Sequence, residues 1–354
     1  LLFIGCVFII IANLFALYPA EFVRKAFDAV LLSVNEGTEK SIKIHYTILK
    51  YGGLIVSFAI LKGVFMFFMR QTIIVMSRKI EFDLKNEIYK QYQSLSMSFY
   101  KKNKTGDLMN RISEDVSRVR MYLGPVLMYG LNIIILFYLV ISKMLSINIT
   151  LTLYVLIPLP ILAILVYYVS SNINKRSEKV QEQLSQITAI SQESFSGIRI
   201  IKSFGHELNT WKFFLKSCKD YTSRQIQLVK IEAMFFPLIV TMIGMSTIFT
   251  IYIGGIESFK GNITTGNIAE FIIYINMLAW PVASVGWITS IVQRAAASQE
   301  RINDFLLIKS EIKNTANIVT PINGDIKFKN VSLTYNDTNI IALKKVTFTI
   351  KEGT

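Results

Sequence analysis

One charged residue lies deep inside an apolar stretch of the chain, where its side chain could bind a polar group of a ligand. Lys62 lies near the middle of the apolar run 47–75. A charge at the centre of a bilayer costs roughly 2.5–3.5 kcal/mol on insertion scales and usually faces a cavity or a partner. We therefore expect Lys62 to face a cavity. The alternative is that its ammonium group extends along the helix to the membrane surface.

Aromatic and methionine side chains are frequent in the last two apolar runs, and they could form the wall of an apolar cavity. Flexible, polarisable methionine side chains adapt to varied apolar ligands. Contact with lipid and packing between helices is the alternative, and it must hold for many of these residues. The candidates that we single out for a cavity are Phe236, Met242, Met277 and Trp280.

The 354 residues contain no complete sequence motif for binding a nucleotide or a metal ion. The phosphate-binding pattern G-x-x-x-x-G-K-[ST] is absent, so we expect no ATP or Mg²⁺ binding and no catalytic residues in this chain alone. His45 and His206 are far apart and no Cys/His cluster accompanies them, so a metal site is not expected. Cys6 and Cys218 fall in segments assigned to different compartments, and we expect no disulfide.

Six apolar runs explain how a chain can be 52% hydrophobic and still carry a net charge of +14. Each run supplies the roughly 20 residues that cross a hydrocarbon core. The sequence therefore predicts an all-α membrane fold with six transmembrane helices. The runs cover about 1–23, 47–75, 122–142, 147–171, 233–256 and 267–292.

Basic residues concentrate in two of the connecting loops. The stretch 70–120 holds 11 Lys and Arg residues and 175–230 holds 10. The positive-inside rule therefore places these loops and both ends of the chain in the cytoplasm. Because the charges lie beside membrane spans, contact with anionic headgroups explains them better than nucleic-acid binding does.

The helical pattern continues past the membrane into both basic loops. No Gly or Pro interrupts residues 64–99, and the returning segment 110–123 is amphipathic. The second loop has the same organisation, so we expect two long cytoplasmic helical hairpins. Their tips carry Gly and clustered aromatic residues, which favours docking to another body over a purely solvated extension.

Local spacing also suggests roles for polar residues near the first tip. Arg111 and Asp115 are four residues apart, which predicts an ion pair along one helix. Asp107 is expected to cap the returning helix. In the first span, Pro19 is expected to kink the helix or to mark its exit from the membrane.

A change of period near the end of the chain indicates a second domain. We assign 1–309 to the transmembrane domain and 310–323 to a linker that contains Pro321. From 324 to 354, alternating apolar residues predict the first β-strands of a soluble domain. A segment this short cannot bury a stable core, so we expect a truncated domain. The chain starts without Met and within an apolar run, so we expect that its N-terminus is missing or was trimmed.

Four segments together resemble a known family. They are SFYKKNKTGDLMNRISEDVSRVR, QESFSGIRIIKSFGHELNTWKFF, YINMLAWPVASVGWITSIVQRAAASQERI and INGDIKFKNVSLTYNDTNIIALKKVTFTIKEG. In this order and spacing the chain resembles an ABC exporter half-transporter with a type IV transmembrane domain. The third segment most resembles multidrug-resistance-like bacterial exporters. The fourth resembles the start of a nucleotide-binding domain.

The resemblance implies a mechanism and partners. Two half-transporters, identical or different, would dimerise in the bacterial inner membrane, and the whole protein would use ATP and Mg²⁺. Coupling helices near 96–105 and 202–211 would dock on nucleotide-binding domains, the second on that of the partner chain. Tyr335 would stack on adenine in the full protein. The tip residues assigned to coupling are Phe99, Tyr100, Gly106, Asp107, Lys202, Phe204 and Glu207.

Several readings of function stay open at this point. We favour export of hydrophobic or amphipathic compounds by alternating access. A flippase for lipid, such as lipid A, is the alternative within transport. A passive channel or a receptor that docks a separate protein, and an exporter fused to an upstream peptidase, are further alternatives.

Overall fold

The computed structural model describes residues 1–35, 41–310, 324–335 and 339–353. Contacts divide them into a helical unit, formed by Leu1–Ser94 and Ser98–Ile308, and a small unit that holds two strands. Most of the proposed linker 310–323 lies outside the described residues.

The helical unit contains six helical rods that are long and apolar enough to cross a membrane. This confirms the six predicted spans within the described residues. The first helix continues through Pro19, and a kink or an exit from the membrane at that position stays a prediction. The rods are α1 (Leu2–Asn35), α2 (Ser41–Ser94), a composite third rod (Thr105–Ile147), α7 with α8 (Ile149–Ser196), α10 (Glu207–Phe259) and α11 (Thr265–Leu306).

The third rod is interrupted by two π-helical turns. It consists of α4 (Thr105–Asn110), η2 (Arg111–Asp115), α5 (Val116–Met121), η3 (Tyr122–Val126) and α6 (Leu127–Ile147). A π-turn holds one more residue than an α-turn, so it rotates the side chains that follow around the helix axis. Spacing rules for an α-helix therefore fail across this part of the sequence.

A short polar junction starts the fourth rod. The Asn148 side chain accepts a hydrogen bond from the backbone N–H of Leu151 (2.8 Å) and so caps α7 (Ile149–Leu156). Pro158 then begins α8 (Pro158–Ser196), at the position in a helix where proline costs no backbone hydrogen bond. The chain can therefore reverse between α6 and α7 with little exposed backbone.

The main core lies where α11 packs on the third and fourth rods. Four fully buried residues of α11 form its centre, and they meet apolar residues of α6, α7 and α8. A smaller core joins α1, α2 and α6 through Ile9, Ile73 and Met128. These contacts bury one stripe of each helix and leave the other faces apolar and exposed, as expected for helices in lipid. The four central residues are Phe271, Tyr274, Ile275 and Leu278.

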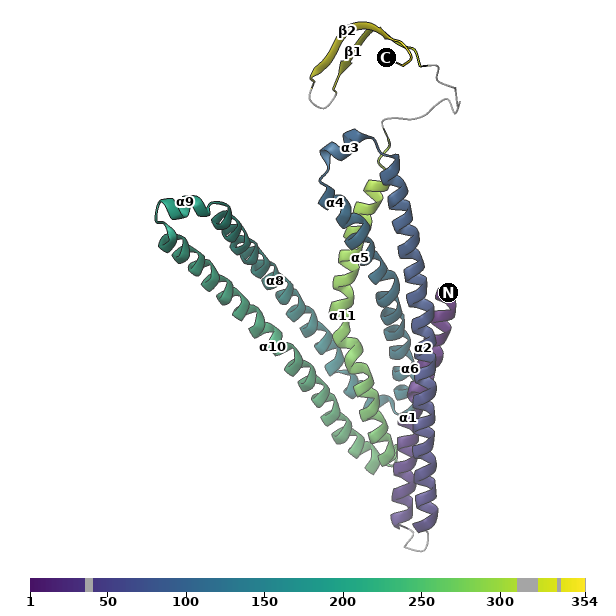
Figure 1. Cartoon of the computed structure of the whole chain (residues 1–354). Coiled ribbons are helices and arrows are strands. Elements are labelled where there is room, and N and C mark those ends of the chain that lie inside the picture. Colours follow the sequence, from purple (N-terminus) through teal and green to yellow (C-terminus); the bar gives the residue numbers. More distant parts are fainter. Residues whose placement is uncertain (36–40, 311–323, 336–338, 354) are drawn as a thin grey trace. The chain divides into compact units, whose positions relative to one another are not determined.

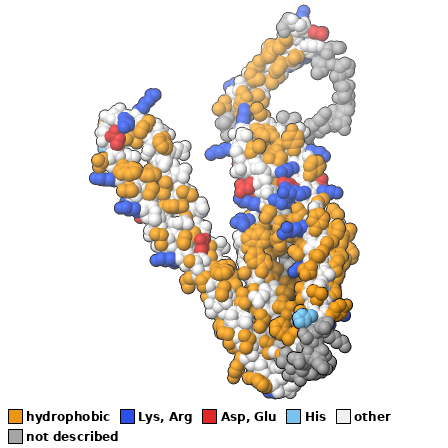
Figure 2. Space-filling view, turned by 60° about the horizontal axis from the view of Figure 1, so that its bottom comes forward, with side chains coloured by type: hydrophobic (Ala, Val, Ile, Leu, Met, Phe, Trp, Pro, Cys, Tyr) orange, Lys and Arg blue, Asp and Glu red, His pale blue; other side chains and the backbone are white. Residues whose placement is uncertain are grey.

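Two helical arms extend from this core (Figure 1). One arm comprises the end of α2, the short α3 (Met97–Lys102) and α4 to α5, with α11 beside it. The other is the α8–α10 hairpin, closed by α9 (Ile198–Ser203), which diverges from the remaining helices. Hydrophobic side chains cover the joined end of the helices, and Lys and Arg gather along the arms (Figure 2). The two hairpins predicted from helical periodicity are therefore present.

The strand unit is a single antiparallel pair. Strand β1 (Ile326–Thr334) pairs with β2 (Ile341–Ile350), with irregularities between Phe328 and Thr334. The stacked rings of Phe328 and Phe348 lie 4.5 Å apart at an angle of 9°. The strands predicted after residue 324 are thus confirmed, and an isolated pair has little apolar surface to bury.

Candidate functional site

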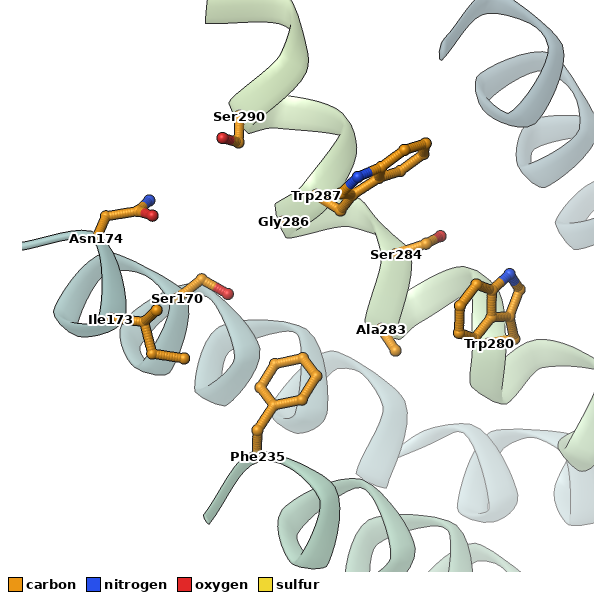
Figure 3. A pocket seen from close by; sticks show the side chains of 10 residues that line it. All are labelled: Ser170, Ile173, Asn174, Phe235, Trp280, Ala283, Ser284, Gly286, Trp287 and Ser290. Atoms are coloured by element: carbon orange, nitrogen blue, oxygen red, sulfur yellow. The ribbon is translucent and has the colours of Figure 1, made fainter. Parts of the chain in front are cut away.

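A cavity of about 440 Å³ opens between α8, α10 and α11 (Figure 3). Three large aromatic residues, Phe235 of α10 and Trp280 and Trp287 of α11, line it. Apolar aromatic walls with a few polar groups are typical of small-molecule sites. Ser170, Asn174, Ser284 and Ser290 supply the polar part of the lining.

The close approach of α8 to α11 depends on a glycine. A Cβ atom at Gly286 would lie 2.9 Å from the hydroxyl oxygen of Ser170, which is closer than side chains tolerate. Nearby, Pro281 interrupts the hydrogen bonding of α11, and Ser284 Oγ donates to the Pro281 carbonyl oxygen (2.8 Å). The cavity wall thus includes a close contact between α8 and α11 and a turn of α11 whose backbone hydrogen bonding is interrupted.

Lys62 lines a separate cavity of about 190 Å³ between α1, α2, α6 and α11, together with Met66 and Met277. Asn13 and Asn132 line it too, and Asn13 Nδ2 donates to Asn132 Oδ1 (2.8 Å). Among the described residues, no ion pair to Lys62 is formed. The chain therefore places a cation and two amides around one small cavity, and its use by a ligand stays a prediction.

Of the residues predicted to form the wall of an apolar cavity, some line a cavity in the structure and others do not. Trp280 lines the larger cavity, but on α10 the lining residue is Phe235, and Phe236 is 72% exposed. Met242 packs against the main core. Helical phase explains the difference between the two neighbouring phenylalanines, because consecutive residues point about 100° apart. A ligand-contacting role for Phe236 and Met242 stays a prediction.

The first tip is bound to the end of α11 by aromatic contacts. Phe305 is fully buried, with its ring centroid 4.7 Å from that of Tyr92 and 6.0 Å from that of Phe99. The Tyr100 hydroxyl donates to the Tyr92 carbonyl oxygen (2.5 Å). The Arg111 guanidinium lies 5.3 Å from the Phe305 ring centroid, a cation–π distance. The first tip therefore packs directly against the end of α11.

The polar contacts after this tip differ from those expected. Arg111 pairs with Asp107 (3.1 Å) and not with Asp115, so the Arg111–Asp115 pair is wrong. Asp107 lies in the first turn of α4 and makes no side-chain cap. Gly106 lies in the same turn, and no atom is within 4 Å of its Cβ position. The π-turn η2 (Arg111–Asp115) is the physical reason, because it removes the α-helical spacing on which the pairing depended.

Asp115 instead joins the third rod to α11. It is 5% exposed and accepts hydrogen bonds from Ser298 Oγ (2.8 Å), from Arg301 Nε (3.1 Å) and from a second nitrogen of the Arg301 guanidinium. These groups lie beyond the apolar runs, in the charged extensions of the helices. Burial disfavours the charged carboxylate, but the hydrogen bonds from Arg301 and Ser298 outweigh it and hold the pKa of Asp115 below its usual value.

The second tip exposes its aromatic residues. Phe204, just after α9, is 73% exposed, and Lys202 pairs with Glu207 across the turn (3.3 Å). A shallow cavity of about 350 Å³ lies beside α9, lined by Phe195, Trp211 and Phe214 among others. Exposed apolar patches of this kind mark interaction surfaces.

A polar network joins α1 to the start of α11 at the opposite end of the helices. The sequence did not predict this connection. The Asp28 carboxylate accepts hydrogen bonds from the Thr264 hydroxyl (2.9 Å) and from the backbone N–H of Gly266 (3.0 Å). Arg24 lies 3.4 Å from the buried Glu270. Charges near the ends of two apolar runs were the available signal, but only the fold shows that α1 and the start of α11 meet.

In the strand unit, Tyr335 follows β1 and is about half exposed. Its backbone N–H donates to the Ile340 carbonyl oxygen (2.9 Å), next to the last paired residues of β1 and β2. Adenine stacking by this ring stays a prediction.

The six-rod unit with two tipped arms defines a class of protein. A family profile described as the ABC transporter transmembrane region matches residues 2–282, and the chain belongs to this family. This confirms the resemblance to ABC exporters.

Several named proteins are similar to the chain. The chain is 29% identical over 98% of its length to the "Multidrug resistance-like ATP-binding protein MdlA" of Buchnera aphidicola subsp. Baizongia pistaciae, and covers 59% of that protein. It is 28% identical over 76% of its length to the "Probable multidrug resistance ABC transporter ATP-binding/permease protein YheI" of Bacillus subtilis, covering 46% of it. An "ATP-dependent lipid A-core flippase" of Pseudomonas fluorescens is 25% identical over 77% of the chain, which covers 45% of the flippase. The chain thus spans about half the length of these relatives.

Proposed function

We propose that this chain is the transmembrane half of an ATP-driven exporter that moves hydrophobic or amphipathic compounds across a bacterial inner membrane. The aromatic cavity of about 440 Å³ between α8, α10 and α11 carries the proposal. A half-buried apolar site within an ABC transmembrane fold is suited to alternate between the two sides of the membrane. Family membership favours this function over a passive channel or a receptor.

The arms supply the coupling in this proposal. Two chains associate, and the nucleotide-binding domains bind ATP and Mg²⁺. The exposed α9 tip docks on the partner chain's nucleotide-binding domain, and Phe204 inserts into its surface. The first tip transmits movement through Phe99 and Phe305 to α11, whose Trp280 and Trp287 line the cavity.

Substitution of Phe204 in the full-length protein tests the coupling. Phe204→Ala is expected to leave the chain folded, because the ring is exposed, and to reduce substrate-stimulated ATP hydrolysis about tenfold. The matched control is Phe259→Ala, at the other end of α10 and 97% exposed, which is expected to leave hydrolysis unchanged. Equal effects of the two substitutions would contradict docking at α9.

Multidrug-type export is our preferred substrate class, and the relatives keep a lipid flippase as the second candidate. Aromatic and methionine side chains in the cavities suit varied apolar ligands. ATP hydrolysis by the reconstituted full-length protein should rise with structurally unrelated hydrophobic dyes. Stimulation by lipid A and not by dyes would favour the flippase.

A further inference from the structure

The aromatic cavity adjoins a second cavity of different chemistry. The second has a volume of about 370 Å³ and lies between α8 and α11. The two share Ser170, Asn174, Gly286 and Ser290 in their walls. The second adds charged and amide side chains to the lining: Lys175, Glu178 and Gln293. The two adjoining cavities thus present an apolar part and a polar part.

Position along the helices places the polar part at the level of lipid headgroups. The apolar run of the α8 rod ends near residue 171 and that of α11 near residue 292. Lys175, Glu178 and Gln293 lie just beyond these ends, whereas Trp280 lies well inside its run. A molecule in this site would hold its apolar part in the hydrocarbon core and its head at the basic, cytoplasmic side.

The polar groups of this site are available to a ligand. Lys175 and Glu178 form no ion pair, and Ser170, Asn174 and Ser290 make no hydrogen bond, with any residue that the structure describes. The adjacent Arg176 does have a partner, since its guanidinium donates to the Gln227 side chain (3.1 Å). Polar side chains that line a cavity at the membrane boundary are stabilised when a ligand or water satisfies them.

The charges indicate the head that would fit. Lys175 and Glu178 are three residues apart and therefore lie on the same face of α8, where they present opposite charges to the cavity. A head with an anionic and a cationic group can satisfy both at once. A head with a single charge would attract one of these two residues and be repelled by the other, which carries the same charge.

We propose that the two adjoining cavities together bind an amphiphile with a zwitterionic head, such as one carrying phosphate and amine groups, drawn from the cytoplasmic leaflet. Its anionic group would contact Lys175, its cationic group Glu178, and its apolar chain would lie against Trp280 and Trp287. The proposal rests on the exporter function and names the class of substrate that this site selects.

Quenching of tryptophan fluorescence tests the proposal, because Trp280 and Trp287 line the apolar part. Full-length protein in detergent, without ATP, is titrated with three amphiphiles that share one brominated acyl or alkyl chain. They are a lysophosphatidylethanolamine, a fatty acid and an alkyltrimethylammonium salt. The quenching assigned to the site is the part lost in a Trp280→Phe/Trp287→Phe variant.

The zwitterionic probe is expected to reach half-quenching at about tenfold lower concentration than either singly charged probe, as for one charge-assisted contact. Lys175→Gln should remove its advantage over the cationic probe, and Glu178→Gln its advantage over the fatty acid. The matched control is Lys179→Gln, on the same helix but outside the lining, which should change neither.

Equal quenching by the three probes would overturn the proposal, since it would mean unselective contact with lipid. Absence of quenching by all three, or preferences that the two substitutions leave unchanged, would overturn it too. Substrate-stimulated ATP hydrolysis is measured separately on the same protein. A protein that hydrolyses ATP but shows no head selectivity would refute the zwitterion site and leave the exporter function standing.

Discussion

Replacement of Asp115 by Asn is expected to detach the cytoplasmic end of α11 from the third rod. The carboxylate is almost fully buried and accepts bonds from Ser298 and Arg301. Each hydrogen bond to a charged group contributes roughly 1.5–3 kcal/mol. The Arg301 side chain is 50% exposed, so water replaces part of what it loses, and we expect a loss of about 2 kcal/mol in the free energy of unfolding.

A double-mutant cycle measures the contact itself. Asp115→Asn, Arg301→Gln and the double variant are unfolded by SDS titration in mixed micelles, followed by circular dichroism. A coupling energy of about 1–2 kcal/mol is expected. Arg118→Gln is the control, because its pair with Glu114 is solvent-exposed and worth about 0.5 kcal/mol at most. Additivity of Asp115→Asn and Arg301→Gln within about 0.5 kcal/mol would refute the assignment.

The same contact predicts a pH dependence. The folded pKa of Asp115 is lowered, so its contribution to stability is present above the unfolded pKa of about 3.9. That contribution is lost as the pH falls through the folded value. The difference in unfolding free energy between wild type and Asp115→Asn should therefore be constant from about pH 5 to 8 and shrink below about pH 4. A difference that shrinks near neutral pH would show that another group is responsible.

Two further substitutions test the packing of α11 at its two ends. Gly266→Ala would put a Cβ 2.5 Å from the Asp28 carboxylate, so we expect SDS unfolding to show a destabilisation of about 1–3 kcal/mol. The control is Gly255→Ala, which should change the stability little because the space around its Cβ position is open. Phe305→Ala removes a fully buried ring and should lower the free energy of unfolding by about 3–5 kcal/mol. The exposed Leu307→Ala should lower it by less than about 0.5 kcal/mol. Similar losses for the two variants would contradict the aromatic contact at the first tip.

The comparison of sequence and fold is clearest around the arms. Hydropathy and helical period correctly predicted the long α2, because both are read along one uninterrupted helix. The same reasoning failed at Arg111 and Asp115, where η2 shifts the phase of the side chains. It also could not choose between Phe235 and Phe236, because one residue of helical phase decides which of them faces the cavity.

The sequence by itself determined the six spans, the two arms, the start of a strand unit and the family, because these follow from local composition, period and motif order. Only the tertiary structure decided the partners of Asp115 and Asp28, the small cavity that Lys62 lines, and the adjoining aromatic and polar cavities between α8 and α11. These features join residues that are far apart in the chain. Their positions depend on how the helices are packed and rotated against one another, which no local pattern specifies.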